Sequence, residues 1–302
     1  MGLEISRPKS DTNEQRRTKI YKITFPKSKS KNGSPLQLWT VNFKERKYMK
    51  IAIYQADTKD NQPQQNIERY KQALEHLEKD TDLLIFPEMY TTGFTIDTNF
   101  AEDMQGESLE FLKQIAKEKD IAVDASILIK EGENYLNRQF FITKDSVSYY
   151  DKAHLFCLSK EPKVVSRGNK PLIVEYKGWR IKLLTCYDLR FPQWARNNFS
   201  QEKGYDYDVL IYVASWADDR ISHWEMLLPA RAIENQAYVL GSNRIGIDKK
   251  GYTYKGASIV INYQGDTIVR AKDNSEEIIY ATLDKDTLNE YRKKFPVALD
   301  WD

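Results

Sequence analysis

Three residues along this chain could together carry out acid–base and nucleophilic chemistry. Glu88 and Cys186 each come after a short apolar run of the kind that forms a buried strand, and Lys152 comes after a short aromatic strand. A cysteine thiolate is a strong nucleophile, a carboxylate can take and return a proton, and an ammonium can stabilise a developing negative charge. If the fold brings them together, these three groups could carry out nucleophilic catalysis through a covalent intermediate.

The stretch 181–192, IKLLTCYDLRFP, is the most informative of the three. Its apolar run ends at Cys186, and polar residues and Pro192 follow, which predicts a buried strand that turns into a helix. A helix N-terminus nearby would favour a thiolate and an oxyanion beside it. Taken alone, Cys186 could equally be a small buried hydrophobe.

The other two residues also have ordinary interpretations when taken singly. Glu88, in FPEMYTTGF, could cap a helix or form a surface ion pair, and Lys152, in YDKAHLF, could be a solvated charge. The combination and its flanking strings are what favour a functional site.

The order Glu88, Lys152, Cys186 resembles the Glu-Lys-Cys triad of the nitrilase, or carbon-nitrogen hydrolase, superfamily. The resemblance covers about residues 49–295 and includes Trp216, the run 223–238 and the string NRIG at 243–246. Within the superfamily, the chain is most similar to the bacterial omega-amidase branch, which hydrolyses 2-oxoglutaramate and related omega-monoamides. The resemblance implies an α/β fold, a four-layer α-β-β-α sandwich, usually assembled as a homodimer.

The same resemblance implies a role for each residue of the triad. Cys186 is expected to form a thioester with the substrate, and Glu88 to move the protons. Lys152, with the backbone N–H of Tyr187, is expected to bind the tetrahedral oxyanion. The implied substrate is a small-molecule amide with a distal carboxylate.

Several further residues are candidates for supporting roles. Glu161, nine residues after Lys152, matches a second glutamate that orients the lysine or the substrate in some family members; it could equally be an exposed loop charge. Trp216 and Phe156 are expected to form pocket walls, and plain core packing is equally compatible with them.

The sequence leaves the partner of the substrate carboxylate open. Arg220 and Arg167 are the candidates, while Arg190 is expected to pair with a carboxylate near the Cys186 turn. A cysteine–histidine mechanism with His154 or His223 as the base is the internal competitor. We disfavour it because the resemblance gives the histidine of DKAHLF no catalytic role.

Composition restricts the class of protein. The chain has 302 residues, 41% of them apolar and 30% charged, enough for a sizeable core. Its two cysteines do not indicate a disulfide framework, and a free nucleophilic thiol suits a reducing cytoplasm. No apolar run approaches 18 residues and no signal-peptide pattern opens the chain, so we expect no membrane span. HExxH, CxxC, GxGxxG and GxxxxGK[ST] are all missing, so we expect no metal and no cofactor.

Charge is divided unevenly along the chain. Residues 1–48 carry a net charge of +8 and the remainder −6. We interpret 1–48 as a basic, disordered and dispensable extension and 49–302 as the hydrolase domain. Nucleic acid is therefore not an expected partner, although a nucleic-acid binder with a basic tail stays open. Two more functions stay open: another superfamily amidase, nitrilase or carbamoylase, and a catalytically silent nitrilase-like scaffold.

Strands and helices alternate in the first half of the domain, which is typical of layered α/β folds. Periodicity alone does not choose between two stacked sheets and one doubly wound sheet. We expect Gly178 to form a tight turn, Ser222 and Glu225 to form a capping box, Pro229 to kink or break that helix, and residues 153–170 to be irregular. The expected strands are 50–55, 83–86, 121–129, 138–143, 147–150, 172–176, 180–184, 208–213, 238–242, 257–262, 267–272 and 278–282, and the expected helices are 66–77, 109–119, 192–199, 222–236 and 284–294.

Overall fold

The structure, a computed structural model, describes residues 5–6, 22–23 and 46–301. The chain divides into two compact units, Met1–Arg46 and Lys47–Asp302. In the first unit, β1 (Ile5–Ser6) pairs antiparallel with β2 (Lys22–Ile23). The disorder expected for residues 1–48 falls almost entirely outside the described residues. The second unit contains the core and the candidate site.

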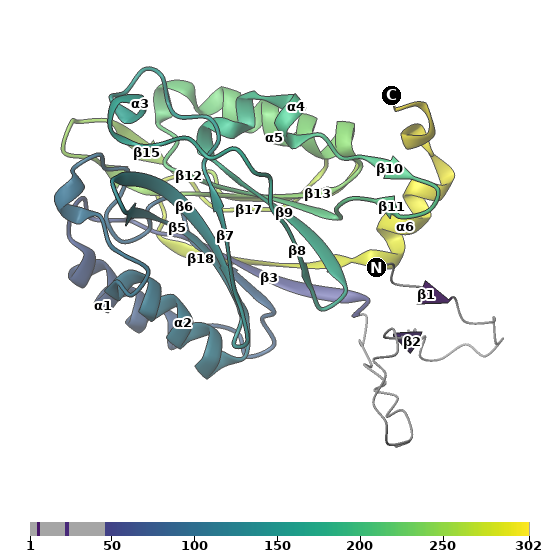
Figure 1. The fold of residues 1–302 in the computed structure, drawn as a ribbon, viewed down its shortest axis with the longest axis horizontal. Helices are drawn as coiled ribbons and strands as arrows, with labels where there is room; N and C mark the ends of the chain where they lie inside the picture. Colours follow the sequence, from purple (N-terminus) through teal and green to yellow (C-terminus); the bar gives the residue numbers. More distant parts are fainter. Residues whose placement is uncertain (1–4, 7–21, 24–45, 302) are drawn as a thin grey trace, which may run out of the picture. The chain divides into compact units, whose positions relative to one another are not determined.

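Two six-stranded mixed sheets form the centre of this second unit (Figure 1). The first has the order β18-β3-β4-β5-β6-β7, with β18 (Glu277–Asp284), β3 (Tyr48–Gln55), β4 (Leu83–Ile85), β5 (Ala122–Glu131), β6 (Asn134–Ile142) and β7 (Val147–Asp151). The second has the order β17-β16-β13-β12-β9-β8, with β17 (Thr267–Arg270), β16 (Ile259–Ile261), β13 (Tyr238–Asn243), β12 (Val209–Ala214), β9 (Trp179–Thr185) and β8 (Ile173–Tyr176).

The central strands of each sheet run parallel, namely β3, β4 and β5 in the first and β9, β12 and β13 in the second. Their carboxyl ends therefore meet at one edge of each sheet, where α/β proteins usually place their sites. The outer strands are antiparallel. Lys177 and Gly178 join β8 to β9 with φ angles of 49° and 83°, the tight turn expected at Gly178.

Helices cover the outer faces of both sheets. Figure 1 shows α1 (Pro63–Leu74) and α2 (Glu107–Lys119) over the first sheet, and α4 (Pro192–Ala195) and α5 (Ile221–Asn235) over the second. The fold is thus the predicted four-layer α-β-β-α sandwich. The remaining elements are α3 (Glu161–Val164), α6 (Lys285–Lys294), the 3-10 helices η1 (Thr98–Phe100), η2 (Cys186–Arg190), η3 (Asp218–Arg220) and η4 (Val297–Asp300), and the strand pairs β10 (Phe199–Ser200) with β11 (Gly204–Tyr205) and β14 (Ile245–Ile247) with β15 (Thr253–Lys255).

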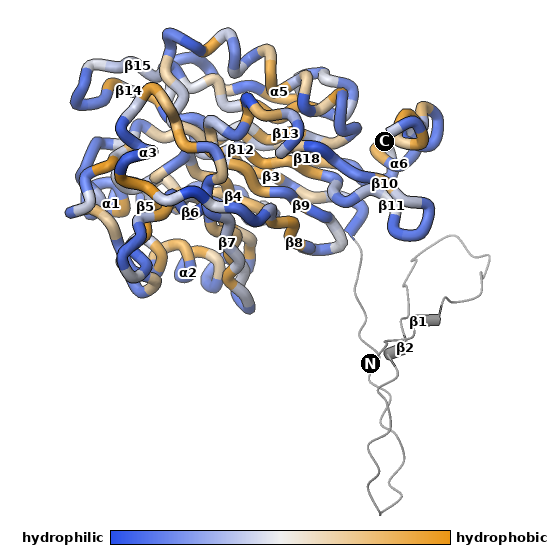
Figure 2. The backbone as a smooth tube through the Cα atoms, turned by 45° about the horizontal axis from the view of Figure 1, so that its top comes forward, coloured by the Kyte–Doolittle hydropathy of each residue, from blue (hydrophilic) through white to orange (hydrophobic). Residues whose placement is uncertain are grey.

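Alternating side chains of the central strands fill two separate apolar layers. In β3, Ile51 and Ile53 face the second sheet, whereas Ala52 and Tyr54 pack with α1 and α2. Successive side chains of a strand point to opposite faces, so a strand that is apolar on both faces must lie between two layers. Figure 2 shows apolar segments along the central strands and polar segments in the outer loops.

The expected capping box at the start of α5 and the expected break at Pro229 are wrong. The 3-10 helix η3 leads straight into α5 at Ile221, so Ser222 lies inside the helix and no side chain caps its start. Glu225 does not close a capping box, and its Oε1 pairs with Arg270 Nη2 at 2.8 Å. The helix also continues through Pro229 without a break. The buried side chains of Trp224 and Leu228 on the inner face hold it against the second sheet.

Other differences concern boundaries. Helix α1 begins at Pro63, three residues before the expected start, because proline suits the first turn of a helix. Residues 153–170 contain the short helix α3, the expected helix 192–199 ends at Ala195, and the hairpin of β14 and β15 was not predicted.

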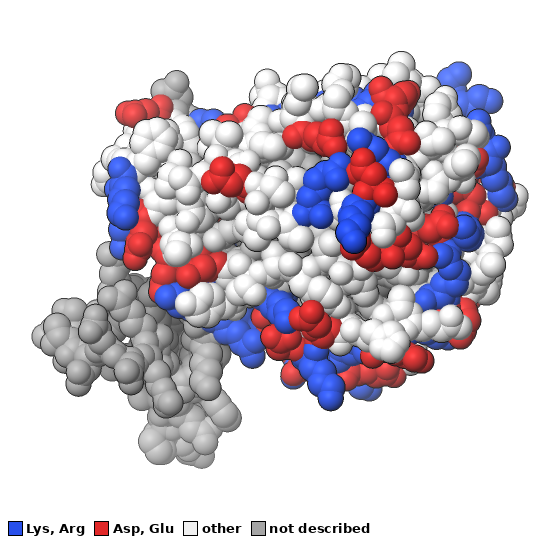
Figure 3. Space-filling view, turned by 180° about the vertical axis from the view of Figure 1, so that it is seen from behind, with Lys and Arg blue, Asp and Glu red and all other residues white. Residues whose placement is uncertain are grey.

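None of the helices in the described ranges has the length and apolar character needed to cross a bilayer. Basic and acidic side chains are interspersed over the face in Figure 3.

Candidate active site

The carboxyl ends of β4, β9 and β12 bring residues of both sheets to one place. Thr185 lies opposite Val213 in the parallel register of β9 and β12, so Cys186 and the residues after β12 follow at the same level. The sheets are joined there by hydrogen bonds from Ser215 N to Glu88 Oε2 at 2.9 Å and from Glu88 N to Ala214 O at 3.4 Å. The site is therefore fixed by the ends of strands rather than by free loops.

Lys152 follows β7 and its side chain is completely buried. Its Nζ lies 2.9 Å from Glu88 Oε1 and 3.1 Å from both carboxylate oxygens of Glu161. Burial alone lowers the pKa of a lysine, but the charges of Glu161 and Glu88 outweigh it and raise the pKa of Lys152 above its ordinary value. Lys152 is thus held as an ammonium ion between two carboxylates.

Both oxygens of Glu88 are engaged. Oε1 accepts hydrogen bonds from Lys152 and from Asn137 Nδ2 at 2.8 Å, and Oε2 accepts the one from Ser215 N. The residue is 1% exposed, so bulk water does not compete for these contacts. Glu88 is therefore fixed in orientation, as a group that transfers a proton along a set path must be.

Glu161 is buried at the start of α3 and touches Lys152 directly. Its Oε2 also accepts the N–H of Phe156 at 2.6 Å, and its Oε1 accepts Asn137 Nδ2 at 3.3 Å. The structure therefore places the candidate Glu161 beside the lysine and not as an exposed loop charge.

Cys186 lies at a sharp turn between β9 and η2, with φ of +47°. Asp188 stabilises this turn, because its Oδ2 accepts Thr185 N at 3.0 Å and Tyr150 OH at 2.8 Å. Its Oδ1 accepts the backbone N–H of His154 at 2.9 Å. One buried carboxylate thus ties the cysteine turn to the segment that carries Lys152.

The thiol differs from the expected thiolate. Burial raises the pKa of Cys186 well above its ordinary value, and the Glu88 carboxylate raises it further through its charge and a hydrogen bond, while Lys152 opposes both. Only the short 3-10 helix η2 starts at this position, so a helix N-terminus adds little. The resting group is a thiol next to a carboxylate that can accept its proton.

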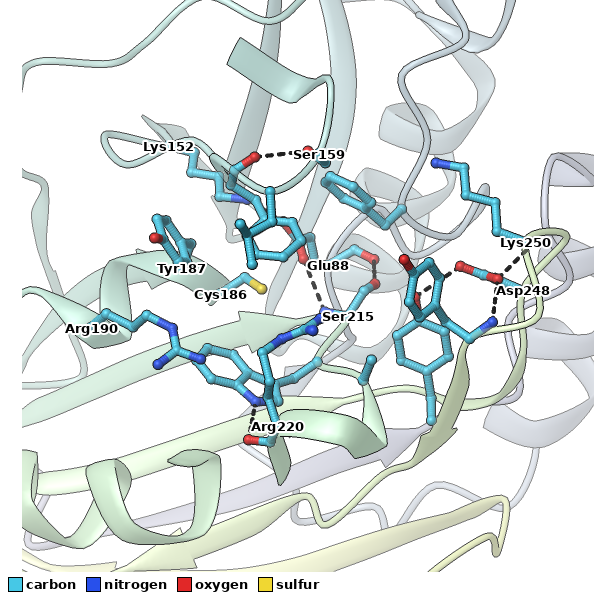
Figure 4. A pocket seen from close by; sticks show the side chains of 17 residues that line it. Glu88, Lys152, Ser159, Cys186, Tyr187, Arg190, Ser215, Arg220, Asp248 and Lys250 are labelled. Carbon is cyan, nitrogen blue, oxygen red and sulfur yellow. Dashed lines mark hydrogen bonds and ion pairs between the residues drawn. The ribbon is translucent and has the colours of Figure 1, made fainter. Parts of the chain in front are cut away.

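Glu88, Lys152 and Cys186 line one pocket, with a cavity volume of about 210 Å³ (Figure 4). The pocket-wall candidates Phe156, Tyr187 and Trp216 line it as well. Phe156 and Tyr187 meet edge to face, with ring centroids 5.4 Å apart. The arrangement offers a small, partly aromatic chamber with the three reactive groups at its inner end.

The remaining candidates are placed differently from one another. Arg220 lines the pocket, whereas Arg167 turns to the backbone, with Nε 2.8 Å from Ala153 O. His154 Nδ1 lies 2.8 Å from Asp188 and its ring stacks on Phe191, so it is a structural residue.

The ion pair predicted for Arg190 with a carboxylate near the Cys186 turn is wrong. Among residues 46–301 Arg190 forms no ion pair with a carboxylate, and its guanidinium lies over the Trp216 ring, 4.7 Å from the centroid. His223 Nδ1 lies 3.1 Å from its Nη2 and is the acceptor of that contact, because an arginine has no acceptor atom.

Asn137 and Ser215 contribute to the site but were not predicted. Asn137 is a buried amide inside strand β6, and Ser215 is the first residue after β12. The polar triplet Asn137–Gln139 within a strand is the one sequence signal that could have indicated a buried polar function.

The chain is similar to known proteins over most of its length. The sequence model for carbon-nitrogen hydrolases matches residues 50–293. An omega-amidase of Escherichia coli K12, YafV, is 39% identical over 238 residues, covering 78% of this chain and 90% of that protein. A 2-oxoglutaramate amidase of Bacillus subtilis is 32% identical and covers 83% and 96%. The crystal structure of XC1258 from Xanthomonas campestris, described as a CN-hydrolase superfamily protein with an arsenic adduct in its active site, has a TM-score of 0.82 at 36% identity and covers 84% and 97%.

Proposed function

Because the chain belongs to the carbon-nitrogen hydrolase family, we propose that it is an omega-amidase that uses Glu88, Lys152 and Cys186 as its catalytic residues. It hydrolyses the terminal amide of short omega-amido acids, and 2-oxoglutaramate gives 2-oxoglutarate and ammonia. The observation that carries the residue assignment is the buried contact of Lys152 with Glu88, in the pocket that Cys186 also lines.

The first half of the reaction forms a thioester. Glu88 takes the proton from the Cys186 thiol as the sulfur attacks the amide carbon, and the carbonyl oxygen becomes an oxyanion. The Lys152 ammonium and the backbone N–H of Tyr187 stabilise that charge. Glu88 then gives its proton to the nitrogen, the carbon–nitrogen bond breaks, and ammonia leaves.

The second half hydrolyses the thioester. Glu88 takes a proton from a water molecule, whose oxygen attacks the thioester carbon, and a second oxyanion forms at the same place. Its collapse breaks the carbon–sulfur bond, and the proton on Glu88 returns to the sulfur of Cys186. The enzyme ends in its starting state, with the acid product released.

The raised pKa of Cys186 has a consequence for this scheme. Since the sulfur keeps its proton at rest, attack requires a base within reach, and the Glu88 carboxylate is that base. Glu161 has a different task. It balances the charge of Lys152, so that Lys152 stays an ammonium when Glu88 becomes neutral.

A coupled assay for ammonia tests the proposal. The purified protein is expected to release ammonia from 2-oxoglutaramate and succinamate, and Cys186→Ala is expected to abolish it. Turnover of a nitrile or an N-carbamoyl amino acid, without ammonia from either omega-amido acid, would overturn the substrate assignment.

We further propose that the protein acts as a homodimer in the cytoplasm. Met226 and Ile233, two helical turns apart on α5, are 70% and 54% exposed, and an exposed apolar face of this kind is typical of a subunit contact. Both cysteines are free, as a reducing compartment permits. Light scattering on the purified protein tests the dimer.

A further inference from the structure

The pocket is lined by more cations than the proposed chemistry uses. Lys152, Arg190, Arg220 and Lys250 line it, against the carboxylates of Glu88 and Asp248. Lys152 is already paired with Glu88 and Glu161. The outer part of the pocket therefore carries an excess of positive charge, which attracts an anionic ligand.

The Asp248 carboxylate does not cancel this excess at Arg190. Asp248 Oδ1 accepts the backbone N–H groups of Lys250 and Tyr252 at 2.8 and 2.9 Å, and Oδ2 accepts Tyr254 OH at 3.1 Å. It is thus occupied within its own turn between β14 and β15. Figure 4 shows Asp248 and Lys250 on the side of the pocket away from Arg190.

Arg190 is the cation best placed to receive a carboxylate. It ends the five-residue helix η2 that Cys186 begins, so both side chains project from one short rigid element. Four residues of a 3-10 helix span about 8 Å, a separation that a short amido acid and an arginine side chain can bridge. The preceding carbonyl, Leu189 O, accepts Arg231 Nη2 at 2.6 Å and fixes the end of η2.

The contacts of Arg190 hold its guanidinium without neutralising it. Stacking on Trp216 orients the plane of the group, and His223 takes one N–H as a neutral acceptor. Since no carboxylate pairs with it among residues 46–301, its remaining N–H donors are available to a ligand. A guanidinium presents a planar fork that matches a carboxylate with two parallel hydrogen bonds.

Arg220 is a weaker candidate. Its Nη1 pairs with the neighbouring Asp219, and its guanidinium lies 5.2 Å from the centroid of the Phe156 ring. Arg220 therefore adds positive charge to the pocket but already has a carboxylate partner.

We propose that Arg190 binds the distal carboxylate of the substrate and thereby selects omega-amido acids over neutral amides. This assignment rests on the proposed function, because it requires an amide substrate attacked by Cys186. Arg190 sets specificity by binding, and the triad performs the chemistry. The fixed separation of Arg190 from Cys186 limits the length of the chain that can place its amide at the sulfur.

The test compares succinamate with butyramide, a neutral amide of the same chain length. Wild type is expected to prefer succinamate in kcat/KM. Arg190→Gln is expected to lower kcat/KM for succinamate by about 30-fold or more, mainly through KM, and to change butyramide by less than about threefold. Arg190→Lys keeps the charge but loses the planar fork. Its kcat/KM for succinamate is expected to lie between the values of wild type and Arg190→Gln. Lys117→Gln, at an exposed lysine of α2 that does not line this pocket, is the control and is expected to keep the preference.

Three results separate the possible failures. If wild type prefers succinamate and Arg190→Gln retains that preference, the role of Arg190 is overturned while the omega-amidase function stands. A loss of the preference in Arg220→Gln alone overturns it in the same way. If wild type turns over butyramide but not succinamate, both the substrate class and the role of Arg190 are overturned. Thermal unfolding of each variant confirms that it is folded.

Discussion

Lys152 Nζ lies 3.1 Å from each carboxylate oxygen of Glu161 and 2.9 Å from Glu88 Oε1. A buried ammonium between two carboxylates is stable only while at least one of them stays charged. Glu88 can therefore become protonated during the reaction, because Glu161 continues to balance Lys152. The two glutamates thus have separate tasks, and removing the charge of each should have a different effect.

Glu161→Gln is expected to lower kcat by about 10- to 100-fold with a smaller effect on KM. Without the Glu161 charge, burial lowers the pKa of Lys152, so activity should be lost at a lower pH on the alkaline side of the profile. Steady-state kinetics from pH 6 to 10 measure this shift. Glu175→Gln, an exposed carboxylate on β8, is the control. An unchanged alkaline limb in Glu161→Gln would contradict the role given to Glu161.

Lys152→Met leaves Glu88 and Glu161 buried without a cation. We expect no activity and a loss of stability of about 3–5 kcal/mol near neutral pH. The folded-state pKa of the orphaned carboxylates should rise, so the stability of the variant is fully present below pH ~4.3 and is lost as the pH rises through the folded pKa. Urea unfolding at pH 5 and pH 8 should show a larger deficit at pH 8. Equal deficits at both values would show that the two carboxylates do not depend on Lys152.

The carboxyl group of Asp124 is fully buried. Burial raises its pKa to about 8, although a hydrogen bond from Gln139 acts in the opposite direction and lowers the pKa. Its Oδ2 has no hydrogen-bond partner among the described residues, as suits a neutral acid. Gln139 in turn accepts Thr185 Oγ1 at 2.9 Å, so this chain of contacts reaches the residue before Cys186.

The folded protein keeps a proton on Asp124 that the unfolded chain releases near pH ~3.9, so this group makes stability fall as the pH rises from about 4 to 8. Asp124→Asn removes the titration. Relative to wild type, the variant should gain stability between pH 5 and pH 8, by up to about 1.4 kcal/mol per pH unit. Unfolding free energies at both pH values measure the difference. A constant difference would mean that Asp124 is already ionised in the folded protein.

Removal of residues 1–45 is expected to leave kcat/KM and the melting temperature unchanged. Every group assigned to the site lies in the unit Lys47–Asp302, as does the core. Lys47 should be kept, because its carbonyl accepts Lys285 N at 2.9 Å and its Nζ pairs with Asp286 at 3.0 Å. A chain that starts at Ile51 loses the first residues of β3 and should melt at a lower temperature. A loss of activity in the variant that lacks only residues 1–45 would assign a function to the basic extension.

The sequence predicts the inner part of the site well and its surroundings poorly. Glu88 and Cys186 each come after an apolar run and Lys152 after a short aromatic strand, local signals that mark strand ends. Ser215 also follows an apolar run, and Asn137 lies inside a strand, but the importance of both comes from strands that pair only in the folded sheets. The same limit explains Arg190. Its position in the chain suggested an ion pair near the Cys186 turn. The nearby carboxylate of Asp188, however, already accepts hydrogen bonds from Thr185, Tyr150 and His154. Tyr150 and His154 are more than 30 residues away in the sequence, so the sequence does not reveal these contacts.

Local rules also failed where tertiary structure overrides them. Ser222 and Glu225 have the spacing of a capping box, yet η3 continues directly into α5 and moves the start of the helix. Pro229 costs one backbone hydrogen bond, and the packing of α5 on the second sheet compensates for it.

The central claim is that the sulfur of Cys186 becomes covalently bound to the acyl part of the substrate. Acid quenching of the enzyme during turnover of succinamate, followed by mass spectrometry of the peptide that carries Cys186, tests it most directly. The account predicts a succinyl adduct on Cys186 in wild type, with neither adduct nor ammonia in Cys186→Ala. Ammonia release that persists in Cys186→Ala would contradict it.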